Sequence, residues 1–174
     1  SVTCTPFEIQ ISVIPPNPVI CPGESIALTA SGADTYVWSP ATGLSDTTGT
    51  VVIANPTVTT TYTITGTTGC VTADTTVTVT VQTPNAGFTY PGSQCLSSNN
   101  ITFTNLGDAP GSCGAGCPTY TWDFGDATTQ SGTTAADASP SHVYGNSGTF
   151  TVTQIVDDGS CIATVTQQIT ISDP

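Results

Sequence analysis

Two carboxylates stand beside an aromatic strand in the stretch YTWDFGDATTQ, residues 120–130. Paired carboxylates serve as general acid and base in glycoside hydrolysis when one has a raised pKa and both face the sugar. Asp123 and Asp126 are three positions apart, on a strand end and a Gly-containing turn. Asp side chains in such turns accept hydrogen bonds from nearby backbone N–H groups. The spacing therefore favours a structural turn, and we expect no enzymatic activity and no catalytic residues.

The single His of the chain, His142, follows Ser139 and Ser141 closely. A Ser-His-Asp triad requires the three side chains to converge in a cleft with oxyanion donors, which adjacency in sequence does not show. The G-x-S-x-G pattern of a nucleophile elbow is absent from the sequence. We interpret His142 as a structural residue at a strand entrance, bonded to backbone or to a neighbouring carboxylate.

Calcium is the cofactor that the carboxylates could hold. Calcium takes oxygen ligands, and no Lys or Arg competes for the carboxylates here. No EF-hand spacing appears, and exposed Asp in loops is usually only solvated. The candidate ligands, which lie in predicted turns, are Asp123, Asp126, Asp157 and Asp158.

The charge balance excludes several classes of function. The 174 residues contain no Lys or Arg against 12 Asp and Glu, a formal net charge of -12. Nucleic-acid binding and phosphate-binding loops depend on Lys and Arg, so we expect neither nucleic-acid partners nor nucleotide chemistry. No apolar run approaches the ~18 residues that span a bilayer, so we expect no membrane insertion.

Alternation with period two dominates the chain and predicts an all-β protein. Thr, Val, Ile and Tyr alternate in several stretches that Pro- and Gly-containing turn clusters separate. The predicted strands are residues 7–14, 59–66, 75–82, 100–105, 149–156 and 164–172.

The two halves of the chain repeat one plan. Each half contains a Cys, a strand, a Trp strand, an aromatic strand, a second Cys and a final strand, which indicates an internal duplication. We predict two β-sandwich domains, residues 1–83 with an N-terminal strand segment and residues 84–174. Trp38 and Trp122 are equivalent, which favours a core role over sugar stacking on an exposed ring.

Seven Cys with little His indicate disulfides in an oxidising, extracellular compartment. In each half the first Cys opens a strand and the second closes a later strand, which we expect to run back to the same end of the sandwich. The predicted bridges are Cys21–Cys70, Cys95–Cys161 and, inside the insertion at 107–118, Cys113–Cys117. Cys4 is left over, which suggests intermolecular pairing, a partner in a neighbouring domain or a free thiol.

The second half resembles the PKD domain over residues 86–172. The family pattern W-x-F-G-D, H-x-Y and G-x-Y/F-x-V falls on Trp122, Phe124, Gly125 and Asp126, on His142 and Tyr144, and on Gly148, Phe150 and Val152. The chain departs from the family in the Cys113–Cys117 insertion and in having Ala127 where a Gly usually follows F-G-D. The resemblance implies an Ig-like β-sandwich, so the predicted fold is two tandem Ig-like, PKD-type sandwiches.

The first half is similar to Ig-like repeats of very long Bacteroidetes surface proteins, including gliding-motility adhesins, through WSPATGLS (38–45) and NPTVTTTYTITG (55–66). This resemblance implies an exported, repeat-built surface or filament protein. Residues 46–48 and 74–76 also match the Asp-Thr-x O-glycosylation pattern of Bacteroidetes envelope proteins, and residues 100–102 match N-x-T. The candidate glycosylated residues are Thr47, Thr75 and Asn100.

The leading hypothesis is a structural and adhesive module pair of an extracellular adhesin or filament. Its partners would be copies or neighbouring domains of the same protein, and possible polymerisation would add the segment at residues 1–13 to a neighbour's sheet edge, with Cys4 bridging subunits. The alternative is a carbohydrate-binding or spacer module of a secreted hydrolase, which would bind surface glycans through an exposed aromatic.

Overall fold

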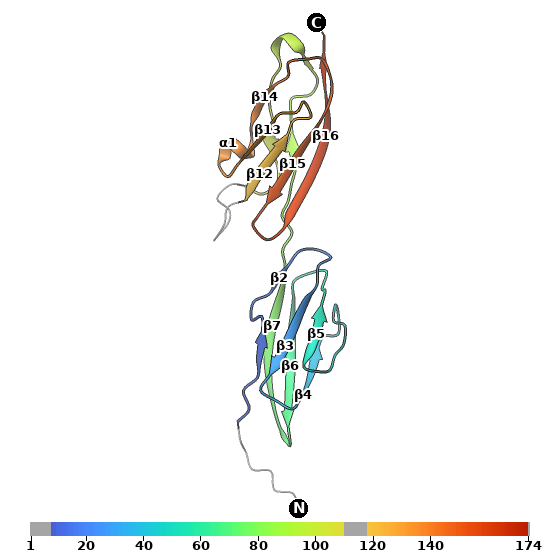
Figure 1. Cartoon of the computed structure of the whole chain (residues 1–174), viewed down its shortest axis with the longest axis vertical. Helices are drawn as coiled ribbons and strands as arrows, with labels where there is room; N and C mark the ends of the chain where they lie inside the picture. The colour runs from blue at the N-terminus through green and yellow to red at the C-terminus, as the bar shows by residue number, and fades with distance from the viewer. Residues whose placement is uncertain (1–7, 110–117, 174) are drawn as a thin grey trace, which may run out of the picture. The chain divides into compact units, whose positions relative to one another are not determined.

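The computed structural model describes residues 8–109 and 118–173. The chain forms two compact units, Ser1–Gln82 (unit 1) and Thr83–Pro174 (unit 2). Each unit is built almost wholly of strands, as the alternation predicted (Figure 1). The division falls one residue before the boundary that the sequence suggested.

Unit 1 is a sandwich of a three-stranded and a four-stranded sheet. The first sheet has the order β1 (Ser12–Ile14), β3 (Ile26–Ser31), β5 (Val51–Ala54). The second has the order β2 (Val19–Ile20), β7 (Val71–Val81), β6 (Thr60–Thr68), β4 (Thr35–Ser39). Neighbouring strands are antiparallel except β2 and β7, which run parallel.

The core of unit 1 follows from the two-residue period of its strands. On β6 the side chains of Tyr62 and Ile64 are fully buried, while Thr61 and Thr63 face outward. Successive side chains of a strand point to opposite faces, so alternating Thr and apolar residues give one wet and one dry face. Trp38 of β4 is buried as expected, and its indole N–H donates to the carbonyl of Gly49 at 2.9 Å.

Unit 2 repeats this arrangement. Its larger sheet has the order β13 (Thr129–Gly132), β12 (Thr119–Asp123), β15 (Gly148–Asp157), β16 (Ile162–Ser172), β9 (Gln94–Cys95). Opposite it lie two strand pairs, β8 (Phe88–Thr89) with β11 (Thr104–Asn105) and β10 (Asn100–Thr102) with β14 (Ser141–Val143). The β9–β16 pair is parallel, like β2–β7, so β4, β6, β7 and β2 correspond to β12, β15, β16 and β9.

Two short helical turns complete unit 2. A 3-10 turn, η1, covers Leu96–Ser98, and a single α-helical turn, α1, covers Ala135–Ala138. Thr134 and Asp137 form a reciprocal capping box at the start of α1. Capping supplies partners for backbone N–H groups that one helical turn leaves unpaired. The one-turn helix is too short to show a period in the sequence.

The core of unit 2 is aromatic. Trp122, fully buried as predicted, lies 5.0 Å from Phe88 and 6.4 Å from Phe124 between ring centroids. Its indole N–H donates to the carbonyl of Asp137 at 2.8 Å, as that of Trp38 does to Gly49. Both Trp residues therefore have their one polar atom satisfied and their rings in the core, which confirms the core role.

One buried polar side chain interrupts this core. Gln154 of β15 is fully buried and occupies the register position opposite Trp122 that Ile64 holds opposite Trp38. Its Nε2 donates to Asn105 Oδ1 at 2.7 Å, and its Oε1 accepts from the backbone N–H of Gly87 at 2.8 Å. These bonds fix the first residues of unit 2 to its core.

The bridge predicted between Cys95 and Cys161 is wrong, because Cys95 is free and exposed while Cys161 is disulfide-bonded. The bridge predicted between Cys21 and Cys70 is wrong as well. Cys21 follows Ile20, which pairs with Val81 at the end of β7, whereas Cys70 precedes the start of β7. Figure 1 shows β2 and the β6–β7 turn at opposite ends of unit 1.

The length of β7 makes this separation decisive. The strand has 11 residues, and at ~3.3 Å per residue its ends lie about 33 Å apart. A disulfide needs Cα atoms within about 7 Å. Cys21 and Cys70 are therefore too far apart to be bonded to each other, although both are disulfide-bonded. Cys4 and the Cys113–Cys117 pair lie outside the described residues.

Among the described residues, no helix has the length and apolar character needed to cross a bilayer.

Candidate functional site

The turn after β12 holds the carboxylates that the sequence singled out. Asp123 Oδ1 accepts from the backbone N–H of Gly125 at 2.8 Å, and Asp126 Oδ1 accepts from that of Thr128 at 3.1 Å. The backbone closes on itself where the Phe124 N–H donates to the Thr128 carbonyl at 3.1 Å. Each carboxylate therefore organises its own part of the turn, as Asp residues in turns commonly do.

Gly125 and Ala127 give this turn its backbone shape. Gly125 has φ +80°, and a Cβ there would lie 2.6 Å from the carbonyl oxygen of Thr151. Ala127 adopts φ 70°, the one described non-Gly residue with positive φ. Ala127 stands where the PKD pattern has Gly, and its left-handed conformation costs an L-residue roughly 1–2 kcal/mol.

His142 connects this turn to the opposite sheet. It lies on β14, where it pairs with Ile101 of β10, and its Nε2 is 2.7 Å from Asp126 Oδ2. Its ring stacks on Phe124 with centroids 4.1 Å apart and planes 8° from parallel. The expected bond to a neighbouring carboxylate is confirmed, and it joins the two layers of the sandwich.

Tyr144 contacts both the imidazole of His142 and the turn after β12. Its ring meets that of His142 edge-on at 4.7 Å, and its hydroxyl donates to the Phe124 carbonyl at 2.9 Å. Burial raises the pKa of this phenol well above its usual range, and the carboxylates of Asp126 and Asp123 raise it further. Tyr144 is therefore a neutral hydrogen-bond donor, not a base.

The pKa of Asp126 reflects two opposing effects. Burial raises it, but the hydrogen bonds from Thr128 and His142 outweigh burial and hold the pKa of Asp126 below its ordinary value. The Thr128 hydroxyl lies 2.5 Å from Asp126 Oδ1. Asp126 is therefore an ionised acceptor with both oxygens engaged.

The geometry does not form a catalytic triad. Thr128 Oγ1 and Asp126 Oδ2 both approach the same nitrogen of His142, Nε2, at 3.3 and 2.7 Å. In a triad the base uses one ring nitrogen for the nucleophile and the other for the carboxylate. The cluster therefore has the composition of a Thr-His-Asp site and the geometry of a structural clamp.

The four candidate calcium ligands do not converge. Asp123 ends β12, whereas Asp157 pairs with Thr119 at its other end. Asp157 and Asp158 accept backbone N–H bonds within their own hairpin turn, from Gly159 and from Ser160 and Cys161. Over residues 8–109 and 118–173 no three His, Cys, Asp or Glu side chains gather as metal ligands would. The four candidate carboxylates therefore do not form one calcium site in the described part of the chain.

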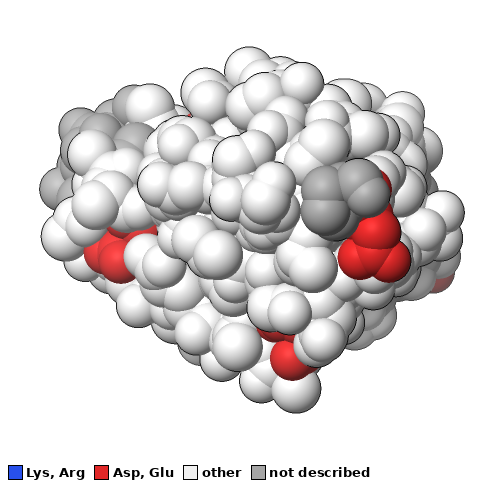
Figure 2. All heavy atoms as spheres, turned by 90° about the horizontal axis from the view of Figure 1, so that it is seen from above, with Lys and Arg blue, Asp and Glu red and all other residues white. Residues whose placement is uncertain are grey.

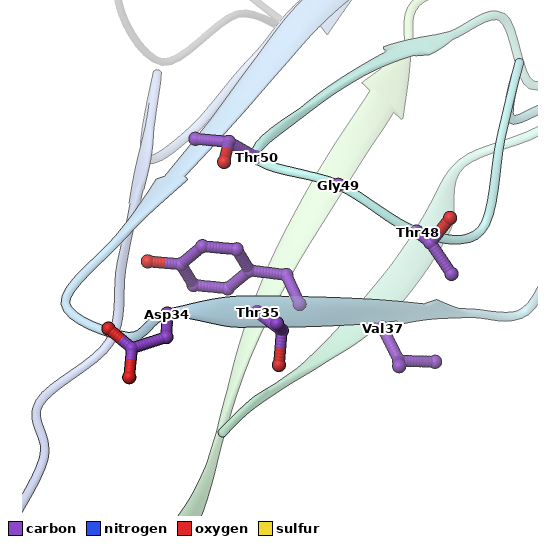
Figure 3. Close-up of a pocket in the computed structure, with 7 residues that line it drawn as sticks. Asp34, Thr35, Val37, Thr48, Gly49 and Thr50 are labelled. Atoms are coloured by element: carbon purple, nitrogen blue, oxygen red, sulfur yellow. The ribbon is translucent and has the colours of Figure 1, made fainter. Parts of the chain in front are cut away.

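Unit 1 contains a shallow pocket of ≈ 330 Å³ between β4 and the segment 48–50 (Figure 3). Its lining consists of Asp34, Thr35, Tyr36, Val37, Thr48, Gly49 and Thr50. Ligand sites usually measure about 300–1,000 Å³ and combine apolar walls with a few polar groups. The pocket is at the small end of this range and its lining supplies no nucleophile–base pair.

The candidate glycosylation residues differ in exposure. Asn100 is exposed on β10, and Thr47 is half-buried beside Asp46. Thr75 pairs with the buried Ile64, so it lies on the inward side of β7 and is also half-buried. Asn100 has the most accessible side chain of the three, and glycosylation stays a prediction.

The surface is sparsely charged. Figure 2 shows Asp and Glu side chains as separate points on a face that is otherwise uncharged. With no Lys or Arg in the chain, His142 is the one side chain able to carry positive charge, and it is paired with Asp126. Contacts with any partner therefore use this protein's hydrogen bonds, apolar atoms or carboxylates.

Comparison with protein families places the PKD domain model on residues 82–172, a range that includes Asp126, His142 and Tyr144. No curated protein matches the chain. The PKD1 domain of Vibrio anguillarum Epp is 25% identical, covering 53% of this chain and 98% of that domain, with a TM-score of 0.41.

Solved structures with two or more Ig-like modules match both units. Three N-terminal domains of the bacteriophage RB49 outer capsid protein Hoc are 15% identical, with TM-score 0.57, covering 95% of this chain and 69% of that one. The D00-D0 domain of intimin is 14% identical, with TM-score 0.50, covering 94% and 100%. At these identities the likeness concerns the fold: tandem Ig-like sandwiches.

Proposed function

Because the chain belongs to the PKD domain family, we propose that it is a non-enzymatic structural and adhesive module pair of an extracellular bacterial adhesin or filament. PKD and Ig-like domains are typically structural or adhesive modules. The observation that carries the proposal is the repetition of one closed sandwich whose polar interior is satisfied internally. Among the described residues, every buried side-chain N or O atom has a hydrogen-bond partner.

The site chemistry supports this role. His142, Asp126 and Tyr144 direct their polar atoms at one another and at the turn backbone, so they stabilise the sandwich instead of presenting reactive groups to a cleft. Catalytic sites differ in having a base and a nucleophile aligned toward an open substrate position. In this domain His142, Asp126 and Tyr144 hold the turn after β12 against the opposite sheet.

The strand topology also suits a protein that bears load. In unit 1 the second strand, β2, runs parallel to the last strand, β7, and in unit 2 the second strand, β9, runs parallel to the last strand, β16. A pull that is transmitted to the start of β2 and to the end of β7 loads the hydrogen bonds between these two strands together in shear. The backbone N–H of Thr80 donates to the carbonyl of Pro18 at 2.9 Å, and that of Gln82 donates to the carbonyl of Ile20 at 3.0 Å.

An extracellular location agrees with the cysteines. Cys21, Cys70 and Cys161 are disulfide-bonded, and disulfides persist in oxidising compartments. The absence of Lys and Arg from the sequence also leaves no cleavage site for trypsin-like proteases.

Immuno-electron microscopy of cell-surface material that carries this chain tests the proposal. Antibody against the chain should label filaments or long surface projections at repeated positions. Label confined to a soluble secreted enzyme would overturn the proposal and favour the alternative, a carbohydrate-binding or spacer module of a hydrolase. Binding of the chain to chitin or cellulose would also favour this alternative. In that case Val37→Asp, at the pocket, should abolish the binding, and Val58→Asp, at an exposed residue outside the pocket, should retain it.

A further inference from the structure

The outer face of the three-stranded sheet of unit 1 is apolar. The side chains of Ile14, Val51 and Ile53 point outward on this face, and 63%, 53% and 42% of their surface is exposed. Thr29 pairs with Ile14 on one side and with Val51 on the other, so these three residues form one row across the sheet. Ala27 and Ile53 form the next row. Exposed apolar residues that lie together, unlike single ones, commonly mark an interaction surface.

This surface, which we call the β3 face, carries no charged side chain. It consists of the outward residues of β1, β3 and β5, which are Ser12, Ile14, Ala27, Thr29, Ser31, Val51 and Ile53. None of them is Asp or Glu, although the chain has 12 of these residues. The hydroxyls of Ser12 and Ser31 bond to each other at 2.8 Å. A partner on the β3 face therefore meets apolar atoms and hydroxyls and approaches no carboxylate of the face.

Unit 2 shows that the fold does not require an apolar outer face. Its strands β10 and β14 pair as β3 and β5 do, and the inward-facing pairs that fix the correspondence are Ile101 with His142 and Leu28 with Val52. Two outward positions that are apolar in unit 1 are polar in unit 2. Ala27 corresponds to Asn100, and Val51 corresponds to Ser141. The same sandwich therefore forms with a more polar outer face, so the apolar residues of the β3 face are not needed for folding.

We propose that the β3 face binds the β3 face of a second copy of this chain. A contact of one surface with its own copy is isologous, so each apolar row covers a row of the partner and is covered in turn. Two sheets pack face to face at about 10 Å with their strands within about 30° of each other. Val and Ile are side chains that suit such a pleated, half-buried surface.

The charge of the chain favours a second copy as the occupant. Two copies, each with a net charge of -12 and no Lys or Arg, repel each other wherever their carboxylates approach. They meet with the least repulsion on a surface without carboxylates, and the β3 face is such a surface. A basic partner would instead be attracted to the carboxylates elsewhere on the chain, and it would gain no charge pairing on the β3 face.

The contact between two β3 faces is weak by its size. The three strands have only 3, 6 and 4 residues. Stable interfaces bury about 1,200–2,000 Å² in total, which is more than one face of three short strands supplies. Contacts repeated along two filaments add up, because each contact after the first is intramolecular. A lateral role between filaments therefore rests on the proposed function, whereas the pairwise contact itself does not.

Nuclear magnetic resonance of the pure, isotope-labelled chain at micromolar to millimolar concentration tests the proposal. We expect the amide shifts of β3 and β5 to change with concentration while those of β10 and β14 stay constant, and we expect translational diffusion to slow. Added salt should strengthen the association, because salt screens the repulsion between the carboxylates of the two copies.

Ile53→Asp should weaken the self-association about tenfold or more, because it places like charges opposite each other across the contact. Val143→Asp is the matched control. Val143 is exposed on β14 and pairs with Asn100 as Ile53 pairs with Ala27, so this variant adds the same charge at the corresponding position of unit 2. It should leave the association unchanged.

Val51→Ser is a second variant, which introduces the residue that unit 2 has at the corresponding position. It should fold at a melting temperature close to that of the wild type and should also weaken the association. It keeps the test decisive if Ile53→Asp does not fold.

Three results would overturn the proposal. A pure chain that stays monomeric at every concentration leaves the β3 face to a different protein. Equal weakening by Ile53→Asp and Val143→Asp assigns the effect to total charge. Association that weakens as salt is added assigns the contact to charge pairing. Surface filaments would still be labelled in each of these cases, so the proposed function and this contact fail separately.

Discussion

The imidazole Nε2 of His142 lies 2.7 Å from Asp126 Oδ2, and this contact joins a strand of one sheet to the turn that leaves the other. Both side chains are largely buried, with 15% and 18% of their surface exposed. The Tyr144 hydroxyl, which donates to the Phe124 carbonyl at 2.9 Å, is a second contact between the same strand region and the same turn.

Asp126→Asn tests the worth of this contact. The variant keeps the size of the side chain and removes its charge. We expect a loss of about 1–2 kcal/mol in the free energy of unfolding at pH 7, because hydrogen bonds to charged groups contribute about 1.5–3 kcal/mol and neutral ones about 0.5–1.5 kcal/mol. Chemical denaturation provides the measurement. Asp74→Asn, on the exposed face of β7, is the matched control and should change stability by less than about 0.5 kcal/mol.

The pH dependence of that difference has a definite sign. The pKa of Asp126 is lowered in the folded state, so its stabilisation is present above the unfolded value of 3.8 and is lost as pH falls through the folded pKa. The gap between wild type and Asp126→Asn should therefore close below about pH 4. A gap that persists unchanged to pH 2 would assign the effect to packing instead of charge.

Ala127→Gly should stabilise unit 2. Ala127 holds φ 70°, which Gly adopts without the Cβ clash, and relief of that strain exceeds the extra unfolded-state entropy of Gly by about 0.5–1 kcal/mol. The melting temperature should rise. Ala163→Gly in the extended strand β16 is the control and should lower it. Equal losses in both variants would show that Ala127 is unstrained.

The sequence predicted the roles of individual core and turn residues better than it predicted the disulfide bonds. Trp38 and Trp122 were identified correctly because a residue repeated in both halves belongs to the shared core, and His142 was identified correctly because no nucleophile elbow accompanies it. The disulfides were mispredicted because β2 and β9 have two residues each, too few to show a period. Those short strands decide the end of the sandwich at which Cys21 and Cys95 lie.

Gln154 shows a signal that was present but not used. In TFTVTQIV the alternation places it on the inward side between Val152 and Val156. A polar residue at an inward position needs partners, and Asn105 and Gly87 are far from it in sequence. Its role could have been suspected from the period, but its partners required the structure.

Gln154→Leu should cost about 2–3 kcal/mol, because it leaves the buried N–H of Gly87 without an acceptor. Amide hydrogen exchange should also accelerate at Gly87, which a general loss of packing would not single out. Gln168→Leu, on the exposed face of β16, provides the control and should leave Gly87 protected. Unchanged exchange at Gly87 in Gln154→Leu would show that the bond does not hold this segment.

Trp38→Ala and Trp122→Ala should each destabilise one unit. Removing a fully buried Trp costs about 3–5 kcal/mol, and the remaining Trp then reports on the other unit by fluorescence. In Trp38→Ala the Trp122 transition should keep its wild-type midpoint, and the reverse should hold in Trp122→Ala. Midpoints that shift together would show that the two units unfold as one.

Force spectroscopy of the chain, held at its two ends, tests the load-bearing role of the parallel strand pairs. Thr80→Pro removes the N–H that donates to Pro18 and should lower the force at which unit 1 unfolds, while the event from unit 2 stays the same. Thr80→Ala keeps the N–H and should unfold at the wild-type force. If Pro and Ala give the same force, the β2–β7 pair does not resist the load, and the mechanical part of the proposed function loses its structural basis.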